Sequence, residues 1–203
     1  MTESDRGVNR IELISVLLIA LTAVATAWSA FQASRWGAEM TLAFNEAGVA
    51  RSESVRASNA GDRQMTIDVS LLGDYVAAVG NGDGELAEFI AERFPDHLAV
   101  ASEAWLATDP LVTPDAPPTP FDMDEYRLED AEEADRLVRE AEARKQEARQ
   151  AGDNSDDFTL TSVLLAVVIL FAALSTKTAG RRLQRILLGL ALAVFAATAG
   201  VIA

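Results

Sequence analysis

The chain has 203 residues, half of them hydrophobic, and a formal net charge of −14 at pH 7. Its 31 acidic residues outnumber its 17 basic ones, so a basic surface for nucleic acid is not expected. Because the chain has no cysteine, disulfides, thiolate catalysis and thiolate metal ligands are excluded. The length leaves room for one domain besides any membrane segments.

Three apolar runs dominate the hydropathy pattern, at residues 13–31, 158–175 and 186–203. Each approaches the ~20 residues that a helix needs to cross a ~30 Å hydrocarbon core. Residues 32–157 instead carry 28 acidic and 11 basic side chains, which suit water. We therefore expect an all-α integral membrane protein with three transmembrane helices. A long extracytoplasmic antiparallel helical hairpin separates the first and second.

The expected division of the chain follows these runs. It comprises a cytoplasmic tail at 1–10, transmembrane helices at 11–31, 158–176 and 186–203, a hairpin at 32–157 with a small tip near 81–121, and a basic cytoplasmic turn at 177–185.

The short turn between the second and third runs predicts the orientation. Lysine and arginine in short loops mark the cytoplasmic side of a membrane. We therefore expect a multi-pass protein of a prokaryotic plasma (inner) membrane, with its N-terminus cytoplasmic. The same basic residues can attract the headgroups of membrane lipids. They are Lys177, Arg181, Arg182 and Arg185.

The first run also fits a cleaved signal peptide. It has Arg10 before an apolar stretch, and 25–27 reads Ala-Thr-Ala, a sequence typical of a cleavage site. Against cleavage, the apolar run continues to Phe31, so we expect the segment to be retained. Trp28, Phe31 and Trp36 then form an aromatic belt at its outer end.

Small residues recur along the first run and far beyond it at alternating steps of four and three. This 3.5-residue spacing predicts one continuous helix whose small seam, of coiled-coil type, packs closely on another helix. The seam in the excursion comprises Ala43, Ala47, Ala50, Ser54, Ala57 and Gly61. Larger apolar residues continue the pattern at Met65, Val69, Leu72, Val76 and Val79.

The return arm is predicted to begin at Asp122, because Asp122 and Glu125 resemble a capping box. We expect its helix to break near Gly152, and the acidic residues at 153–157 to cap the second span. Its packing seam is predicted at Ala131, Ala134, Val138, Ala141 and Ala148.

Few residues indicate chemistry. The single histidine, His97, is expected to be exposed or to cap a helix, and residues 153–157 lack the glycine and distal glutamate of a calcium loop. No catalytic set, cofactor or metal site is predicted, so an enzyme is not expected. Thr22, Thr26 and Ser29 form a mildly polar face of the first span, which suits helix packing or, alternatively, a pore.

Four segments together resemble an uncharacterised family of three-span prokaryotic membrane proteins of unassigned function. The resemblance covers most of the chain and implies that the chain is one unit; it implies no activity, cofactor or site residue. The segments are residues 23–36 (AVATAWSAFQASRW), 104–111 (AWLATDPL), 115–120 (DAPPTP) and 125–128 (EYRL).

Two functions from different classes remain open. The first is a non-enzymatic scaffold or accessory subunit that forms homo-oligomers or joins a larger membrane complex through its acidic stalk and partly apolar tip. The alternative is an oligomeric ion channel lined by the first transmembrane helix. A near absence of charge in the spans favours the scaffold over the channel.

Overall fold

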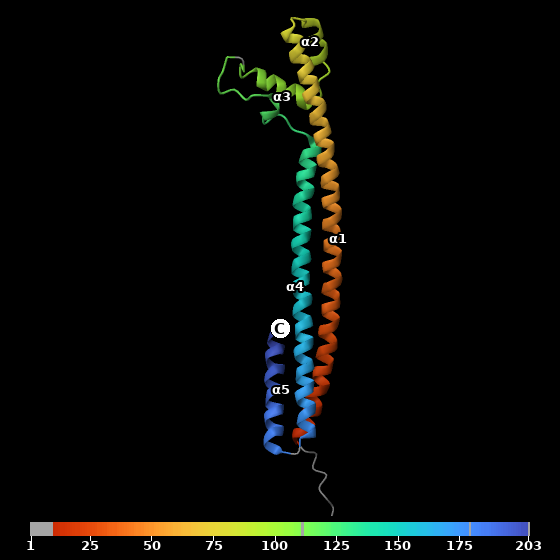
Figure 1. Ribbon diagram of the computed structural model, residues 1–203. Helices are drawn as coiled ribbons and strands as arrows, with labels where there is room; N and C mark the ends of the chain where they lie inside the picture. The colour runs from red at the N-terminus through yellow and green to blue at the C-terminus, as the bar shows by residue number, and fades with distance from the viewer. Residues whose placement is uncertain (1–9, 111, 179, 203) are drawn as a thin grey trace, which may run out of the picture. The chain divides into compact units, whose positions relative to one another are not determined.

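The computed structural model describes residues 10–110, 112–178 and 180–202, and within them all regular structure is helical. Residues 1–9 of the predicted tail and Ala203 of the third predicted span lie outside these ranges. The elements are α1 (Arg10–Gly80), α2 (Gly84–Ala91), α3 (Asp96–Leu106), the short 3₁₀ helix η1 (Pro120–Asp122), α4 (Glu129–Lys177) and α5 (Arg181–Ile202) (Figure 1).

Helix α1 confirms the prediction of one continuous helix, because it runs for 71 residues without a break. No proline interrupts it, so every backbone N–H after the first turn can donate within the helix. It ends where Gly82 adopts a φ of +75°, which favours glycine. Asp83 then caps α2 by accepting a hydrogen bond from the backbone N–H of Leu86.

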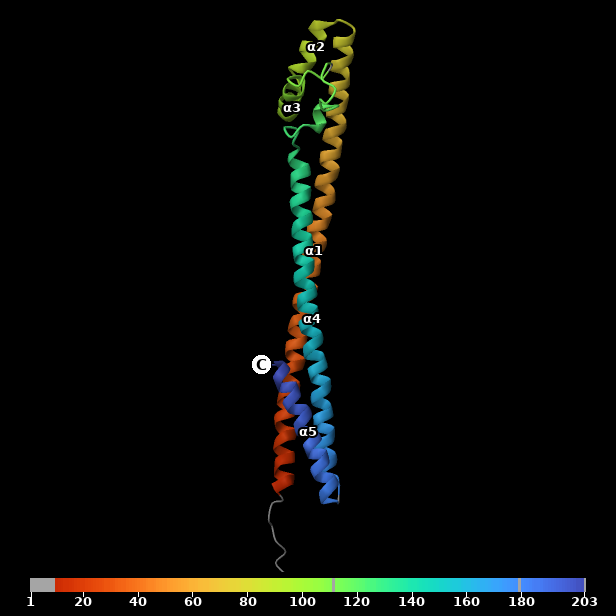
Figure 2. The same cartoon turned by 90° about the vertical axis from the view of Figure 1, so that its left-hand side faces the viewer.

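The chain forms two compact units, and the first comprises residues 1–44 and 145–203. In its described part, the beginning of α1, the end of α4 and the whole of α5 lie side by side, as both views show (Figures 1 and 2). Its core draws on all three helices: Leu18, Val168, Ala172, Leu188 and Ala191.

The second unit comprises residues 45–144. The later part of α1 and the beginning of α4 run side by side in opposite directions, and α2, α3 and η1 lie between them in the chain (Figure 2). Leu98 and Ala101 of α3 are fully buried, whereas Leu86 and Phe89 of α2 are about half exposed.

The start of α4 corrects a prediction. The helix begins at Glu129 and not near Asp122, which lies in η1 and accepts a hydrogen bond from Thr119. Phe121 and Tyr126 pack edge to face, with ring centroids 5.0 Å apart, outside any long helix. Tertiary contacts of Tyr126 hold this segment, and a local capping pattern contains no information about them.

The predicted break at Gly152 is also wrong, because α4 passes through it without interruption. A Cβ atom there would lie 3.0 Å from Sδ of Met40, so the glycine allows α1 and α4 to approach closely. The acidic segment at 153–157 is therefore helical and does not form a cap. Within it, Ser155 Oγ donates to the carbonyl oxygen of Ala33 at 2.9 Å.

By length and composition, two helices in the described ranges could cross a membrane, namely α1 and α4. In α5, three of the first five residues are arginines (Arg181, Arg182 and Arg185), and the uninterrupted apolar stretch begins only at Ile186. An all-helical chain with two candidate spans is therefore established. A third span belongs to the proposal below.

Candidate functional site

The small-residue seam of α1 lies on the less exposed face of the helix. In the first unit Ala43 is buried. In the second unit Ala50, Ser54 and Gly61 are buried, and Ala47 and Ala57 are half-buried. A Cβ atom on Gly61 would lie 3.4 Å from the backbone nitrogen of Ala131, which is van der Waals contact between α1 and α4. Small side chains thus permit a close approach of the two helices.

The buried face of α4 differs from the predicted seam at two positions, Val138 and Ala131. Ala134 and Ala141 are buried in the second unit, but Val138 is 49% exposed and Leu137 is buried in its place. Ala131 is exposed in spite of its contact with Gly61. From Ala134 to Ala141 a helix face can follow steps of four and three, through Val138, or of three and four, through Leu137. The sequence alone therefore allowed either residue to face α1.

The larger apolar stripe also lies one position away from the inner face of α1. Met65, Val69, Val76 and Val79 are each between 43% and 55% exposed, and Leu72 is half-buried. The less exposed positions continue the small seam instead. They are Gln64, Asp68, Leu71, Tyr75 and Ala78.

Asp68, on this inner face, is a fully buried carboxylate with three hydrogen-bond donors. His97 Nε2 lies 2.7 Å from Asp68 Oδ2, and the Tyr126 hydroxyl donates to the same oxygen at 2.8 Å. Gln64 Nε2 donates to Oδ1 at 3.0 Å. We call Gln64, Asp68, His97 and Tyr126 the Asp68 cluster.

The Asp68 cluster joins α1, the N-terminal turn of α3 and the segment before α4. Burial raises the pKa of Tyr126, and the hydrogen bond and negative charge of Asp68 raise it further. His97, which we expected to be exposed or to cap a helix, is instead a partner of Asp68, and Pro95 occupies the N-cap position of α3. Side chains from distant segments thus stabilise the buried charge of Asp68 by hydrogen bonds. The role of the Asp68 cluster is therefore structural.

Aromatic contacts complete the packing of the tip. Trp105 Nε1 donates to the carbonyl oxygen of Pro117 at 2.7 Å, which ties α3 to the proline-rich segment. Tyr75 of α1 and Phe94 meet edge to face, with centroids 5.7 Å apart.

Among the described residues, no group of three or more His, Cys, Asp or Glu side chains could hold a metal ion.

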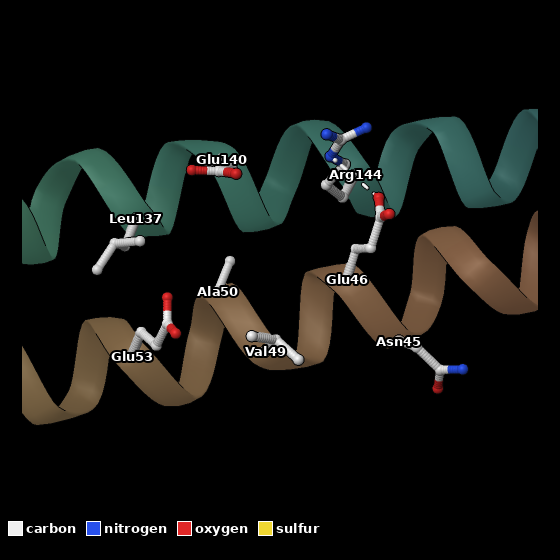
Figure 3. A pocket seen from close by; sticks show the side chains of 8 residues that line it. All are labelled: Asn45, Glu46, Val49, Ala50, Glu53, Leu137, Glu140 and Arg144. Carbon is white, nitrogen blue, oxygen red and sulfur yellow. Dashed lines mark ion pairs between the residues drawn. The ribbon is translucent and has the colours of Figure 1, made fainter.

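A shallow groove of about 390 Å³ lies between α1 and α4 in the second unit (Figure 3). Ala50 and Leu137 lie between the helices, and Arg144 Nε reaches Glu46 Oε2 at 3.4 Å. The remaining lining residues are Asn45, Val49, Glu53 and Glu140. The groove has three carboxylates, Glu46, Glu53 and Glu140, around apolar side chains. Its negative charge favours contact with positively charged groups over binding of an anion.

The predicted pore face of α1 lies within the packing of the first unit. Thr22 and Ser29 have no exposed surface, and Thr26 is half-buried. The hydroxyls of Thr22 and Thr26 donate to the carbonyl oxygens of Leu18 and Thr22. Ser29 Oγ has no hydrogen-bond partner within the described part of the chain.

Three of the four basic residues of the turn lie in the first two turns of α5. Arg181, Arg182 and Arg185 line a surface hollow of about 600 Å³ together with Ile186. Lys177 is the last residue of α4. This clustering places several positive charges at one end of the apolar helices.

Comparison of the chain with family models, curated proteins and solved structures gives no match.

Proposed function

We propose that the chain is a non-enzymatic, self-associating scaffold of a prokaryotic plasma membrane. In this proposal α1, α4 and α5 cross the bilayer, the N-terminus is cytoplasmic, and the second unit stands in water on the other side. The four basic residues of the turn, Lys177, Arg181, Arg182 and Arg185, then lie at the cytoplasmic headgroups.

The polarity of the first unit supports this placement. Its interior holds Ser15 and Ser175, whose hydroxyl oxygens lie 3.0 Å apart without exposed surface. Over the three apolar runs, nearly all the outward-facing side chains of α1, α4 and α5 are apolar. In lipid, helices associate through small and polar contacts while large apolar side chains face the acyl chains. The exposed set includes Leu17, Leu21, Val24, Leu160, Val163, Leu170, Leu183, Ile186 and Leu190.

The observation that supports self-association is the exposed apolar stripe of α1 in the second unit, which runs from Met65 to Val79. Its positions follow a heptad, with valine at both a positions (Val69, Val76) and leucine at the d position between them (Leu72). Valine at a with leucine at d favours two parallel strands. Between 65 and 80 the only charges are Asp74 and the buried Asp68. Because the rest of the chain is so acidic, the stripe is the surface on which a second copy of the chain would meet the least charge repulsion. Anchoring in one membrane makes the two helices parallel.

Glutamate in the stripe should therefore disrupt the oligomer. We expect Val69→Glu to weaken self-association by roughly tenfold or more, since it places a charge in an apolar contact. The measurement is oligomer mass in detergent and cross-linking in membranes. Ile67→Glu is the matched control, because Ile67 is 53% exposed and lies on the opposite side of α1. Equal oligomer fractions in both variants and the wild type would refute the proposal.

A channel lined by α1 is the competing function. The full burial of Thr22 and Ser29 within a single chain leaves them no lumen to face, which favours their role in helix packing. Reproducible cation-selective currents from the purified protein in planar bilayers would reverse this preference.

A further inference from the structure

We infer that Gln32, Arg35, Trp36 and Glu39 of α1 bind the headgroup of a zwitterionic aminophospholipid, that is, a phosphate joined to a primary ammonium. These four residues line a cavity of about 210 Å³ in the first unit. They lie at i, i+3, i+4 and i+7 and so share one face of the helix. We call this surface the headgroup site.

The depth of the headgroup site fits a lipid headgroup, on the membrane placement proposed above. The apolar run ends at Phe31, directly before Gln32. At 1.5 Å per residue, Arg35 and Trp36 lie roughly 6–8 Å beyond the apolar run. The headgroup layer is roughly 5–8 Å thick on each side of the hydrocarbon core. The aromatic pair Trp28 and Phe31, with centroids 5.9 Å apart, lies one turn deeper, where the acyl chains begin.

Gln32 and Arg35 supply the phosphate half of the site. A guanidinium presents a planar fork of N–H donors that matches two phosphate oxygens, and an amide NH₂ adds two more donors. Both residues lie on the deeper side of the site, where the phosphate of a phospholipid joins its glycerol. Arg35 is exposed and Gln32 is half-buried, so the fork is accessible at the cavity.

Trp36 and Glu39 supply the ammonium half. An indole face attracts a cation more strongly than any other aromatic side chain, and a carboxylate accepts hydrogen bonds from ammonium N–H groups. Glu39 lies one turn farther from the hydrocarbon than Arg35. The positive and negative side chains thus follow the order of phosphate and ammonium in the headgroup.

The two charged side chains do not neutralise each other. Arg35 and Glu39 are four residues apart, yet no ion pair within 4 Å joins them, and neither pairs with another residue in the described ranges. Arginine placed N-terminal to glutamate is the weaker orientation for a helical pair. A dipolar ligand satisfies both charges at once.

The test measures retained lipid by native mass spectrometry of the full chain, after exchange into nanodiscs of equal parts phosphatidylethanolamine, phosphatidylcholine and phosphatidylglycerol. We expect the wild type to prefer phosphatidylethanolamine. Glu39→Gln should remove its preference over phosphatidylcholine, because choline has no N–H to donate. Arg35→Gln should lower retention of all three lipids by about tenfold. Asp62→Asn and Arg63→Gln, at exposed positions of α1 in the second unit, are the matched controls.

A preference for phosphatidylglycerol, or unchanged retention in both site variants, would overturn the inference. Carbonate extraction and oligomer mass, measured on the same samples, separate this failure from that of the proposed function. A chain that is membrane-integrated and oligomeric but shows no headgroup preference refutes the headgroup site alone. A chain that carbonate extracts from membranes refutes the placement on which both proposals depend.

Discussion

At the scale of single residues, Asp68 has the most demanding environment in the second unit. A carboxylate without exposed surface is costly unless donors surround it, and here three side chains supply them. Tyr126 and His97 also meet each other edge to face, with centroids 5.7 Å apart. The Asp68 cluster therefore combines charge, hydrogen bonding and packing at the point where the tip joins α1.

The raised pKa of Tyr126 predicts a loss of tip stability in alkali. A folded-state pKa above the unfolded value of about 10 means that the contribution is complete below pH 10. It declines as the pH rises toward the folded-state pKa, because the tyrosinate would be buried away from water and would also face the Asp68 carboxylate. We expect hydrogen exchange of α3 to accelerate above pH 10, measured by mass spectrometry against an unstructured peptide standard.

The matched variant for this prediction is Tyr126→Phe. It removes one hydrogen bond to a buried charge and should destabilise the tip by about 1.5–3 kcal/mol at neutral pH. It should also abolish the additional loss above pH 10. The same alkaline profile in wild type and variant would show that another group is responsible.

At the scale of elements, the close approach of α1 and α4 depends on small side chains. In the first unit Ala148 has no exposed surface, and Ala151 is buried one turn later. Side chains of this size leave no space for additional methyl groups. The seam thus sets the distance between the helices in each unit.

Enlarging Ala148 should therefore destabilise the first unit. We expect Ala148→Leu to cost about 1–3 kcal/mol, the usual penalty for overpacking a tight contact. Thermal unfolding in detergent, followed by circular dichroism, provides the measurement. Gln150→Leu is the control, since Gln150 is exposed on the same helix and also uncharged. Equal melting temperatures of the two variants would remove the case for a tightly packed seam.

At the scale of the whole molecule, orientation in the membrane is the property that the proposals share. The absence of native cysteine permits single-cysteine labelling without background. Thr113 is exposed near the tip, and Gly180 lies in the basic turn, where an added Cβ atom meets no atom within 4 Å. In the proposed topology the two positions lie on opposite sides of the bilayer, and cysteine at either one causes little structural disturbance.

We expect an impermeant maleimide to label Thr113→Cys but not Gly180→Cys in intact cells, because lysine and arginine in short loops stay in the cytoplasm. Labelling of both variants after permeabilisation is the control for reactivity. The reverse pattern in intact cells would invert the topology and move the headgroup site to the inner leaflet.

The sequence by itself determined where apolar and charged residues separate, and that α1 continues beyond its apolar run. Both properties follow from local composition: lipid needs about 20 apolar residues, and a proline-free segment with small residues sustains a helix. The 3.5-residue period of small residues in α1 is likewise visible in the chain itself, and Ala43, Ala50, Ser54 and Gly61 of that period are buried.

Only the tertiary structure decided which face of each helix packs against its neighbour. Val138 and Leu137 differ by one position and by a rotation of about 100°, so the neighbouring helix selects between them. Likewise, two of the three side chains that donate to Asp68 lie 29 and 58 positions away in the chain, and nothing local marks Asp68 as buried. Gly152 resembled a break because glycine weakens an isolated helix, whereas here it makes room for Met40. Such choices depend on contacts between distant segments, which a pattern within one segment does not contain.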